Sequence, residues 1–242
     1  MIEIKNASKS FGNKEVIKNM NLTIEDGYIF GFIGPNAAGK TTTINMITGA
    51  TNISSGDVLI KGKSITTESV EAKKEIGFVP DSPDMFLNMK VIDFFNFVAD
   101  IYGVSEELRK ERIERYSKDF EISHFLKDYI DSLSHGTRQK VMIISVLIHE
   151  PSIWILDEPM TGLDPQSAFV LKEKMKEHAK KGNTVFFSTH VLEVAEKLCD
   201  KIAIINQGEI VYLGGYDELK SKYPDAKDLE ELFINLVGGN NE

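Results

Sequence analysis

The sequence predicts an α/β fold in which a core of strands and helices is interrupted by an all-helical segment. In the last third of the chain, short apolar runs alternate with helical patterns, which is typical of parallel strands covered on both faces. Residues from about 83 to 148 have helical spacing instead. A chain of 242 residues is long enough for a full core, so we expect one domain with subdomains.

The N-terminal part alternates short apolar strands with turn signals. Phe11-Gly12-Asn13 and Glu25-Asp26-Gly27 separate these strands, and the pattern indicates antiparallel pairing. Residues 58–60, followed by Gly62, predict another such strand. Residues 76–79 predict a buried one.

A glycine-rich loop follows a further apolar run at residues 29–33. Residues 34–42 have the spacing G-x-x-x-x-G-K-[ST], and residues 40–48 then have the pattern of a helix that Gly49 stops. Glycines let backbone N–H groups turn toward a polyphosphate, and the helix start adds partial positive charge. We therefore predict a P-loop, since a plain strand-turn-helix is disfavoured by the correct flanking elements. Its predicted nucleotide-binding residues are Gly34, Asn36, Ala37, Ala38, Gly39, Lys40, Thr41 and Thr42.

Two side chains of this loop have predicted roles in ATP chemistry. Lys40 would reach the β- and γ-phosphates, and the Thr41 hydroxyl would bind Mg²⁺. ATP and Mg²⁺ are therefore the predicted cofactors.

The helical segment begins with apolar residues on one face. Val91, Phe94, Phe95, Val98 and Tyr102 have that spacing, and the following stretch is rich in charge.

After this segment, residues 153–156, 185–187 and 202–205 read as buried parallel strands. Asp164-Pro165 opens the helix between the first two, with Asp as the N-cap and Pro in the first turn.

Two carboxylates end the first of these strands. Asp157 would hold Mg²⁺ beside Thr41, and Glu158 would act as the general base on water. A merely solvated strand end is the alternative, which the preceding apolar run and the P-loop disfavour.

The C-terminal tail carries a helical stripe of apolar residues that ends at Gly238-Gly239, with residues 240–242 expected to fray. The stripe packs on its own domain or, alternatively, forms a partner surface. Its members are Leu229, Leu232, Phe233 and Leu236.

Composition excludes several other classes. A net charge of −9 argues against nonspecific binding to nucleic acid. Cys199 is the single cysteine, so an internal disulfide is impossible, and a core thiol is expected. The apolar run 141–148 is shorter than the roughly 20 residues of a membrane span. Glu3 and Lys5 do not suit a signal peptide, so we expect a cytoplasmic protein that reaches the membrane only through a partner.

These motifs together resemble those of the ATP-binding cassette (ABC) ATPase family. Residues 34–42 resemble its Walker A motif and residues 153–158 its Walker B motif. Residues 133–140 lie where the family has its LSGGQ signature. Residues 161–164 resemble the D-loop, and His190 resembles the switch histidine. Phe11 matches the aromatic residue that stacks on adenine.

The resemblance implies a P-loop NTPase (RecA-like) core with an antiparallel β subdomain and an inserted α-helical subdomain. Residues 1–242 would form a single ABC ATPase domain. Its core would comprise 1–82 and 149–215, its helical subdomain about 83–148, and its helical tail about 216–242.

The resemblance also implies a head-to-tail dimer that sandwiches two ATP molecules. Ser134 and the N–H groups near Gly136 would complete the γ-phosphate cage in trans, and the D-loop residue Asp164 is also expected to bind nucleotide. His190 would contact the γ-phosphate and orient the attacking water together with Glu158.

The sequence departs from the family pattern at His135, Thr137, Ala37 and Asp81. Ala37 replaces a common P-loop glycine and would cost about 1–2 kcal/mol if the site needs positive φ. Asp81 stands where the Q-loop glutamine usually lies. A carboxylate near a phosphate is repelled, so we expect Asp81 to face the metal or to swing out when no nucleotide is bound.

The main hypothesis is the ATPase subunit of a membrane exporter, resembling bacterial ABC-2 and other exporter-type ATPases of drug, peptide or ion efflux. Its expected partners are transmembrane permease subunits and a second ABC ATPase subunit, identical or not, and no nucleic acid. Location at the inner face of the cell membrane follows. The helical insertion, especially residues 83–102, would dock the membrane partner, although its aromatics Phe86, Phe94, Phe95 and Phe97 would equally suit a subdomain core. The alternatives are a soluble ABC ATPase, such as an iron–sulfur assembly factor, and an ATP-sensing module with little turnover.

Overall fold

The structure is a computed structural model that describes residues 1–223 and 229–238, with only the backbone described at 237 and 238. The strands are β1 (Ile2–Phe11), β2 (Lys14–Ile24), β3 (Ile29–Ile33), β4 (Ser55–Ile60), β5 (Lys63–Ser64), β6 (Ile76–Val79), β7 (Ile153–Leu156), β8 (Thr184–Thr189), β9 (Lys201–Asn206) and β10 (Glu209–Gly214). The helices are α1 (Lys40–Ile47), α2 (Ser69–Lys73), α3 (Val91–Ile101), α4 (Glu106–Asp119), α5 (His135–His149), α6 (Pro165–Lys180), α7 (Leu192–Leu198), α8 (Tyr216–Lys222) and α9 (Leu229–Gly238), with 3₁₀ turns η1 (Ser123–Phe125) and η2 (Ile130–Ser132).

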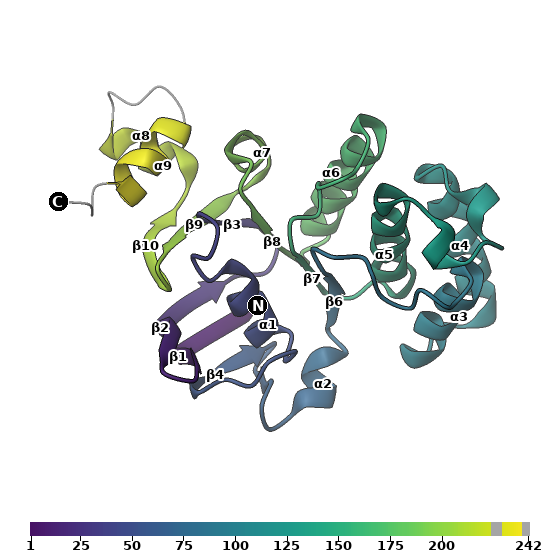
Figure 1. Cartoon of the computed structure of the whole chain (residues 1–242), viewed down its shortest axis with the longest axis horizontal. Coiled ribbons are helices and arrows are strands. Elements are labelled where there is room, and N and C mark those ends of the chain that lie inside the picture. The colour runs from purple at the N-terminus through teal and green to yellow at the C-terminus, as the bar shows by residue number, and fades with distance from the viewer. Residues whose placement is uncertain (224–228, 239–242) are drawn as a thin grey trace.

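Within the described residues, the strands form two sheets. The first is antiparallel, with the order β2-β1-β4-β5. The second has the order β10-β9-β3-β8-β7-β6 and is parallel except for its edge strand β10. The predicted mixed α/β fold, with a P-loop core, an antiparallel β subdomain and a helical subdomain, is therefore confirmed (Figure 1).

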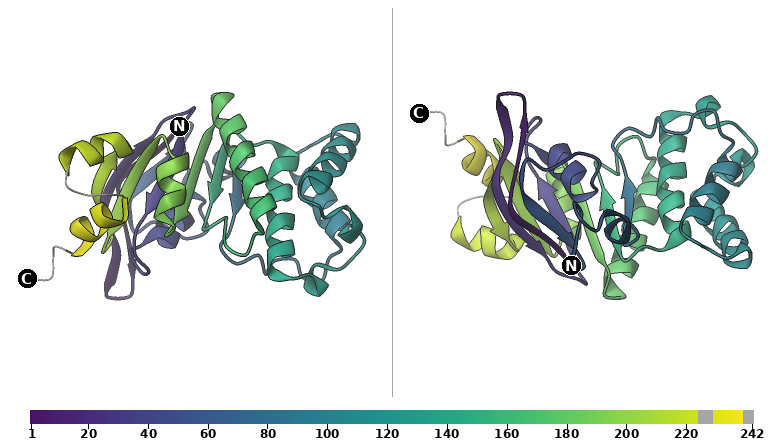
Figure 2. Two further views of the ribbon diagram at one scale, coloured as in Figure 1. Left: turned by 90° about the horizontal axis from the view of Figure 1, so that it is seen from above. Right: turned by 90° about the horizontal axis from the view of Figure 1, so that it is seen from below.

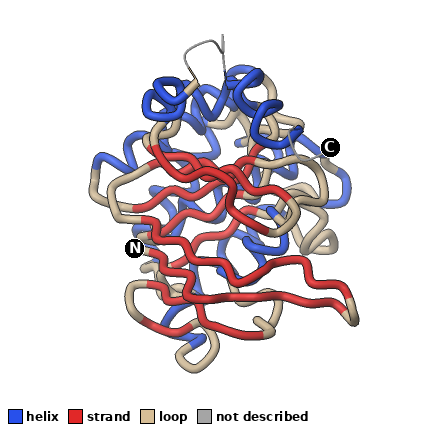
Figure 3. Tube along the Cα trace, turned by 90° about the vertical axis from the view of Figure 1, so that its left-hand side faces the viewer, coloured by secondary structure: helices blue, strands red, loops and turns tan. Residues whose placement is uncertain are grey.

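The parallel strands are covered on both faces, as their continuous apolar sequences predict. Alternate residues of β7 point to opposite sides, because side chains alternate along a strand. Ile153 and Ile155 pack in the core that includes α1 and the antiparallel sheet, whereas Trp154 and Leu156 pack against α5 and α6. The parallel strands therefore form a layer with α1 and the antiparallel sheet on one side and α5 and α6 on the other (Figures 2 and 3).

Helices α3, α4 and α5 gather at one end of the molecule, and α8 and α9 lie at the opposite end (Figures 1 and 2). The helical pattern expected from about residue 83 is corrected here, because α3 begins only at Val91. Residues 80–90 instead form an irregular linker with bends and a turn at residues 85–89, in which Pro83 disfavours a helical conformation at the residue before it.

The C-terminal stripe packs on its own domain. Leu229 and Leu232 are buried in a cluster with Ala195 of α7 and Leu219 of α8. The predicted helix end at Gly239 and the frayed residues 240–242 lie outside the described residues. Cys199 is partly buried and packs against the core, and burial raises the pKa of its thiol, as expected of a core cysteine.

Candidate nucleotide site

Several loops meet at one edge of the parallel sheet. The P-loop follows β3, Asp157 and Glu158 follow β7, His190 follows β8, and Asp81 follows β6 soon after its last residue. Strands β3, β8, β7 and β6 are parallel neighbours. Their carboxyl ends therefore lie at the same edge, which is where parallel α/β sheets bind ligands.

A cavity of about 350 Å³ opens at this edge. It is lined by Lys14, Val16, Pro35, Asn36, Ala37, Gly39, Lys40, Thr41, Thr42, Asp81 and Glu158. Most of the predicted P-loop residues are thus brought together with Glu158 and Asp81. The other predicted nucleotide-binding residues in the described chain do not line it, namely Phe11, Gly34, Ala38, Ser134, Gly136 and Asp164.

The backbone of the P-loop turns sharply before α1. Ala37 has a φ of 63° and Gly39 a φ of 112°, both in the left-handed region. A Cβ on Gly39 would lie 2.6 Å from Ile17 Cδ1, so only glycine fits there. The loop then presents Lys40 as the first residue of α1.

The Lys40 side chain is almost fully buried and lies between the loop and Glu158. Its Nζ donates to the carbonyl oxygens of Gly34 at 2.8 Å and Pro35 at 3.3 Å. The same atom is 3.8 Å from Glu158 Oε1. The ammonium group therefore stands at the floor of the cavity, beside the carboxylate that the sequence predicts to be the base.

Glu158 is held from two further sides. Its Oε2 lies 2.9 Å from His190 Nδ1 and accepts from the backbone N–H of His190 at 3.3 Å. Its own backbone N–H donates to Ser188 Oγ at 3.0 Å. The backbone of Glu158 has a φ of 47°, in the left-handed region, so the chain leaves the extended conformation of β7 at this residue. The Glu158 carboxylate thus stands between Lys40 and His190.

Asp157 is buried beneath the cavity. Ser188 Oγ donates to its Oδ1, and the Thr41 hydroxyl is a second hydrogen-bond partner. Burial raises the pKa of Asp157, and the nearby Asp81 carboxylate acts in the same direction, while the Ser188 and Thr41 hydrogen bonds oppose the shift. Ser188 therefore contacts both carboxylate residues, a role that its sequence position two residues before His190 does not reveal.

Thr41 and Asp157 are the residues of this site that could contribute ligands to Mg²⁺. In residues 1–223 and 229–238, no group of three or more His, Cys, Asp or Glu residues is arranged as a metal site. Thr41 and Asp157 nevertheless present oxygen donors in contact with each other. Proteins usually bind Mg²⁺ through oxygen ligands, namely one or two carboxylates together with substrate phosphates and water.

The signature residues lie at the start of α5. Ser134 caps this helix by accepting from the backbone N–H of Thr137 at 3.3 Å. A Cβ on Gly136 would lie 2.3 Å from the carbonyl oxygen of Gly162, so the D-loop packs directly on the signature.

Asp164 caps α6 and joins it to α5. It accepts from the Ser167 N–H at 2.9 Å, and it forms an ion pair with Lys140 at 2.7 Å. The Lys140 ammonium and the Ser167 hydrogen bonds hold the pKa of Asp164 well below its usual range. In this chain Asp164 therefore has a capping role that its sequence context predicts.

Phe11 ends β1 and pairs with Lys14 across the hairpin. Its ring is 54% exposed and has the Lys9 ammonium 4.7 Å from its centroid. Lys14 and Val16, which follow it, line the cavity. Phe11 is thus free to meet a ligand, and its stacking on adenine stays a prediction.

A P-loop facing a strand-end carboxylate and a histidine defines the class of protein, a P-loop nucleoside triphosphatase. Comparison with known proteins identifies the family. Residues 17–161 match the family model described as ABC transporter.

Curated relatives match nearly the whole chain. The linearmycin resistance ATP-binding protein LnrL of Bacillus subtilis is 34% identical over 92% of this chain and 71% of its own length. The ABC-type transporter ATP-binding protein EcsA of Bacillus subtilis is 32% identical over 98% and 96%. The Nod factor export ATP-binding protein I of Cupriavidus metallidurans is 31% identical over 90% and 72%.

Solved structures of ATP-binding cassettes have the same fold as this chain. An ATP-binding subunit of an ABC transporter superposes with a TM-score of 0.93 at 29% identity, covering 98% of this chain and 99% of that one. A dimeric, post-hydrolysis ATP-binding cassette with ADP and Pi has a TM-score of 0.80 at 26% identity, over 89% and 98%. The chain belongs to the ABC transporter family and is an ATP-binding cassette ATPase.

Proposed function

We propose that this chain hydrolyses ATP to power a membrane exporter, with Glu158 as the general base. The observation that carries the proposal is the Glu158 carboxylate, which lies 3.8 Å from Lys40 Nζ and 2.9 Å from His190 Nδ1 beside the P-loop. A lone strand-end carboxylate would have neither neighbour.

The chemical roles follow from these contacts. Glu158 Oε2 would accept a proton from the attacking water, a contribution typically worth about 10²–10⁴ in rate. His190 would orient that water through its contact with Glu158. Lys40 would exchange its bonds to Gly34 and Pro35 for phosphate oxygens.

Mg²⁺ would be held by Thr41 and Asp157, with Asp81, whose carboxylate lies near that of Asp157, as a further acidic residue beside it. The ion would supply positive charge against the phosphates. The buried Asp157 carboxylate and its contact with Thr41 support this assignment, as does the position of Asp81 on the cavity wall.

A second ATPase subunit would complete the site. Ser134, Gly136 and Asp164 do not line the cavity of their own chain among the described residues, as expected if they serve the nucleotide of a partner. One similar solved cassette is described as dimeric with ADP and Pi, which supports the same arrangement here.

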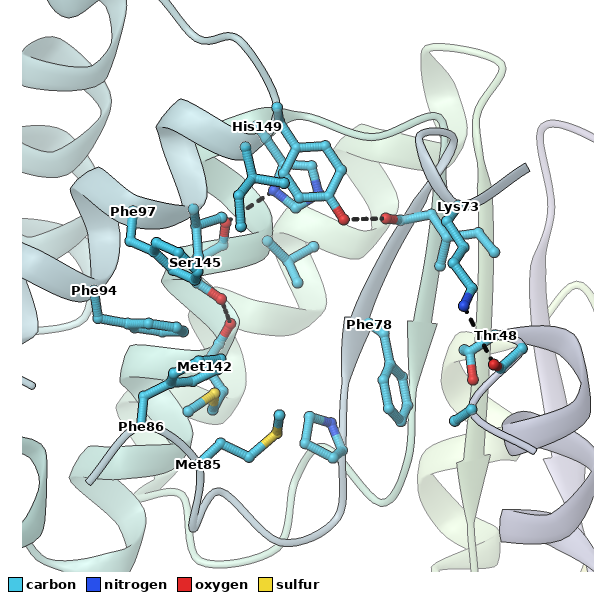
Figure 4. A pocket seen from close by; sticks show the side chains of 18 residues that line it. Thr48, Lys73, Phe78, Met85, Phe86, Phe94, Phe97, Met142, Ser145 and His149 are labelled. Carbon is cyan, nitrogen blue, oxygen red and sulfur yellow. Dashed lines mark hydrogen bonds between the residues drawn. The ribbon is translucent and has the colours of Figure 1, made fainter. Parts of the chain in front are cut away.

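The transmembrane partner would dock on an apolar groove of about 360 Å³ between the helical insertion and the core (Figure 4). Phe86 and Phe97 line it and are 41% and 42% exposed, whereas Phe94 and Phe95 are buried. The insertion's aromatics thus divide between core and surface. No helix in the described part of the chain has the length and apolar character of a bilayer span. An apolar segment of a separate membrane protein is the proposed occupant, which would place the chain at the inner membrane face.

Export is the proposed direction because relatives carry the names of linearmycin resistance and Nod factor export proteins. The alternative is an ABC ATPase without a membrane partner. Copurification of the chain with a multi-span protein from its native membrane would support the exporter, and its recovery without one would contradict it.

Glu158→Gln tests the catalytic assignment. Because the amide cannot accept the water proton, we expect the ATPase kcat of the purified chain to fall at least about 100-fold while ATP is still bound. Glu173→Gln, which removes an exposed partner of Lys176 on α6, is the matched control. Retention of turnover in Glu158→Gln would remove the base from the proposal.

A further inference from the structure

The linker between β6 and α3, residues 80–90, touches each functional region of the molecule. Asp81 lines the nucleotide cavity. Met85 and Phe86 line the apolar groove (Figure 4). Between them, Asp84 forms an ion pair with Arg138 of the signature helix α5 at 2.7 Å.

Arg138 lies one helical turn after the signature serine. Its backbone N–H donates to the carbonyl oxygen of Ser134 at 2.9 Å. Its guanidinium donates to the carbonyl oxygens of Ile130 at 3.0 Å and Asp131 at 2.6 Å, and to Asp84 Oδ1 at 2.7 Å. The planar guanidinium holds its acceptors in a fixed geometry. The start of α5 is therefore tied at once to η2 and to the linker.

Hydrogen bonds to both carboxylate oxygens of Asp84 hold this side chain in position. Its Oδ2 accepts from Ser82 Oγ at 3.1 Å, while Oδ1 faces Arg138. The hydrogen bonds from Arg138 and Ser82 lower its pKa, so the carboxylate is charged at neutral pH. Within residues 1–223 and 229–238, Asp84 is the only carboxylate paired with Arg138.

The groove side of the linker begins two residues later. Phe86 has a φ of 55°, and its ring lies 4.9 Å from the ring of Phe94 and 5.8 Å from that of Phe97. The packing of Phe86 therefore places the linker against α3 two residues from Asp84.

We propose that Asp84 and Arg138 are positioning residues that set the start of the signature helix α5, and with it the position of Ser134. The inference rests on the proposed function, because Ser134 would act on the nucleotide of a second chain. A plain surface ion pair is the competing explanation, since Asp84 is 52% exposed and exposed pairs contribute little to stability.

Hydrogen exchange tests the positioning in a single chain without nucleotide. In Asp84→Asn we expect amides 138–142 of α5 to exchange about fivefold faster, the low end of typical coupling between sites. Glu106→Gln removes an equally short ion pair, to Lys110 at 2.8 Å on α4, and should leave these amides unchanged. Unchanged exchange in Asp84→Asn would overturn the proposal.

Conservative replacement separates positioning by the carboxylate from simple stabilisation. Asp84→Asn should lower the ATPase kcat about fivefold with little change in the KM for ATP. Asp84→Glu keeps the carboxylate and should retain most of the wild-type kcat, while the bonds from Arg138 to Ile130 and Asp131 stay in place in both variants. An equal loss of kcat in the two variants would overturn the proposal.

A different experiment shows whether the proposed function fails. If the Glu158→Gln protein stays monomeric with ATP in analytical ultracentrifugation, the proposed function is wrong. The exchange result still decides the positioning in that case, because it needs neither dimer nor hydrolysis.

Discussion

At the residue scale, Ala37 occupies a P-loop position with a φ of 63°. Alanine is strained in this region and glycine is not, at a cost of about 1 kcal/mol. We therefore expect Ala37→Gly to raise the unfolding free energy or tighten ATP binding by about that amount. Ala37→Val should act in the opposite direction, because a β-branched side chain is still less compatible with positive φ. Thermal unfolding and ATP titration of both variants measure this, and equal values for the two would contradict it.

Another residue-scale effect concerns pH. His178 is buried against Trp154, with ring centroids 4.1 Å apart, and burial lowers its pKa from 6.5 to about 4. Between these values the unfolded chain binds a proton that the folded chain excludes, so stability falls as the pH falls. We expect the wild type to lose about 2 kcal/mol more than His178→Phe between pH 7 and pH 5. Urea unfolding at both pH values measures the difference, and parallel losses would contradict it.

At the scale of elements, α9 is held by its buried stripe. Leu232 is fully buried in the cluster with α7 and α8, so Leu232→Ala should cost about 2–4 kcal/mol. Ile234 on the same helix is 60% exposed, and Ile234→Ala should change stability by less than about 0.5 kcal/mol. Denaturant unfolding combined with hydrogen exchange of α9 compares them. Equal costs would mean that the stripe does not anchor the helix.

Elements with a strong pattern were predicted well, and those without one were not. The parallel strands β7, β8 and β9 follow from continuous apolar runs, and the start of α6 follows from Asp164-Pro165. Strand β10 was not predicted, although Ile210 to Leu213 form a continuous apolar run. It is an edge strand in which Tyr212 is buried while Val211 and Leu213 are exposed, so the run does not mark a strand covered on both faces. The linker 80–90 was not predicted because its one aromatic residue, Phe86, is placed by ring contacts with Phe94 and Phe97 of α3, which no local pattern shows.

At the scale of the whole molecule, the proposed head-to-tail dimer can be tested by mixing two inactive variants. Lys40→Ala removes the P-loop cation of one chain, and Ser134→Arg blocks the signature of another. A mixed dimer of these inactive variants contains one intact composite site, so an equal mixture should recover about a quarter of wild-type ATPase activity. Sites formed within one chain would give no recovery.

The sequence by itself determined the features that depend only on neighbouring residues in the chain. The P-loop, the strand-end carboxylates Asp157 and Glu158, and the cap at Asp164 each depend on residues within a few positions of one another. Apolar runs and turn residues likewise determined the α/β class, because burial on both faces requires them.

Only the tertiary structure decided which of these local features meet. The strand order β3-β8-β7-β6 brings Lys40, Asp157, Glu158, His190 and Asp81 to one edge, and that order depends on long-range pairing that no local pattern encodes. Ser188 and the Asp84–Arg138 pair became visible for the same reason, since their partners lie 30 or more residues away in the chain.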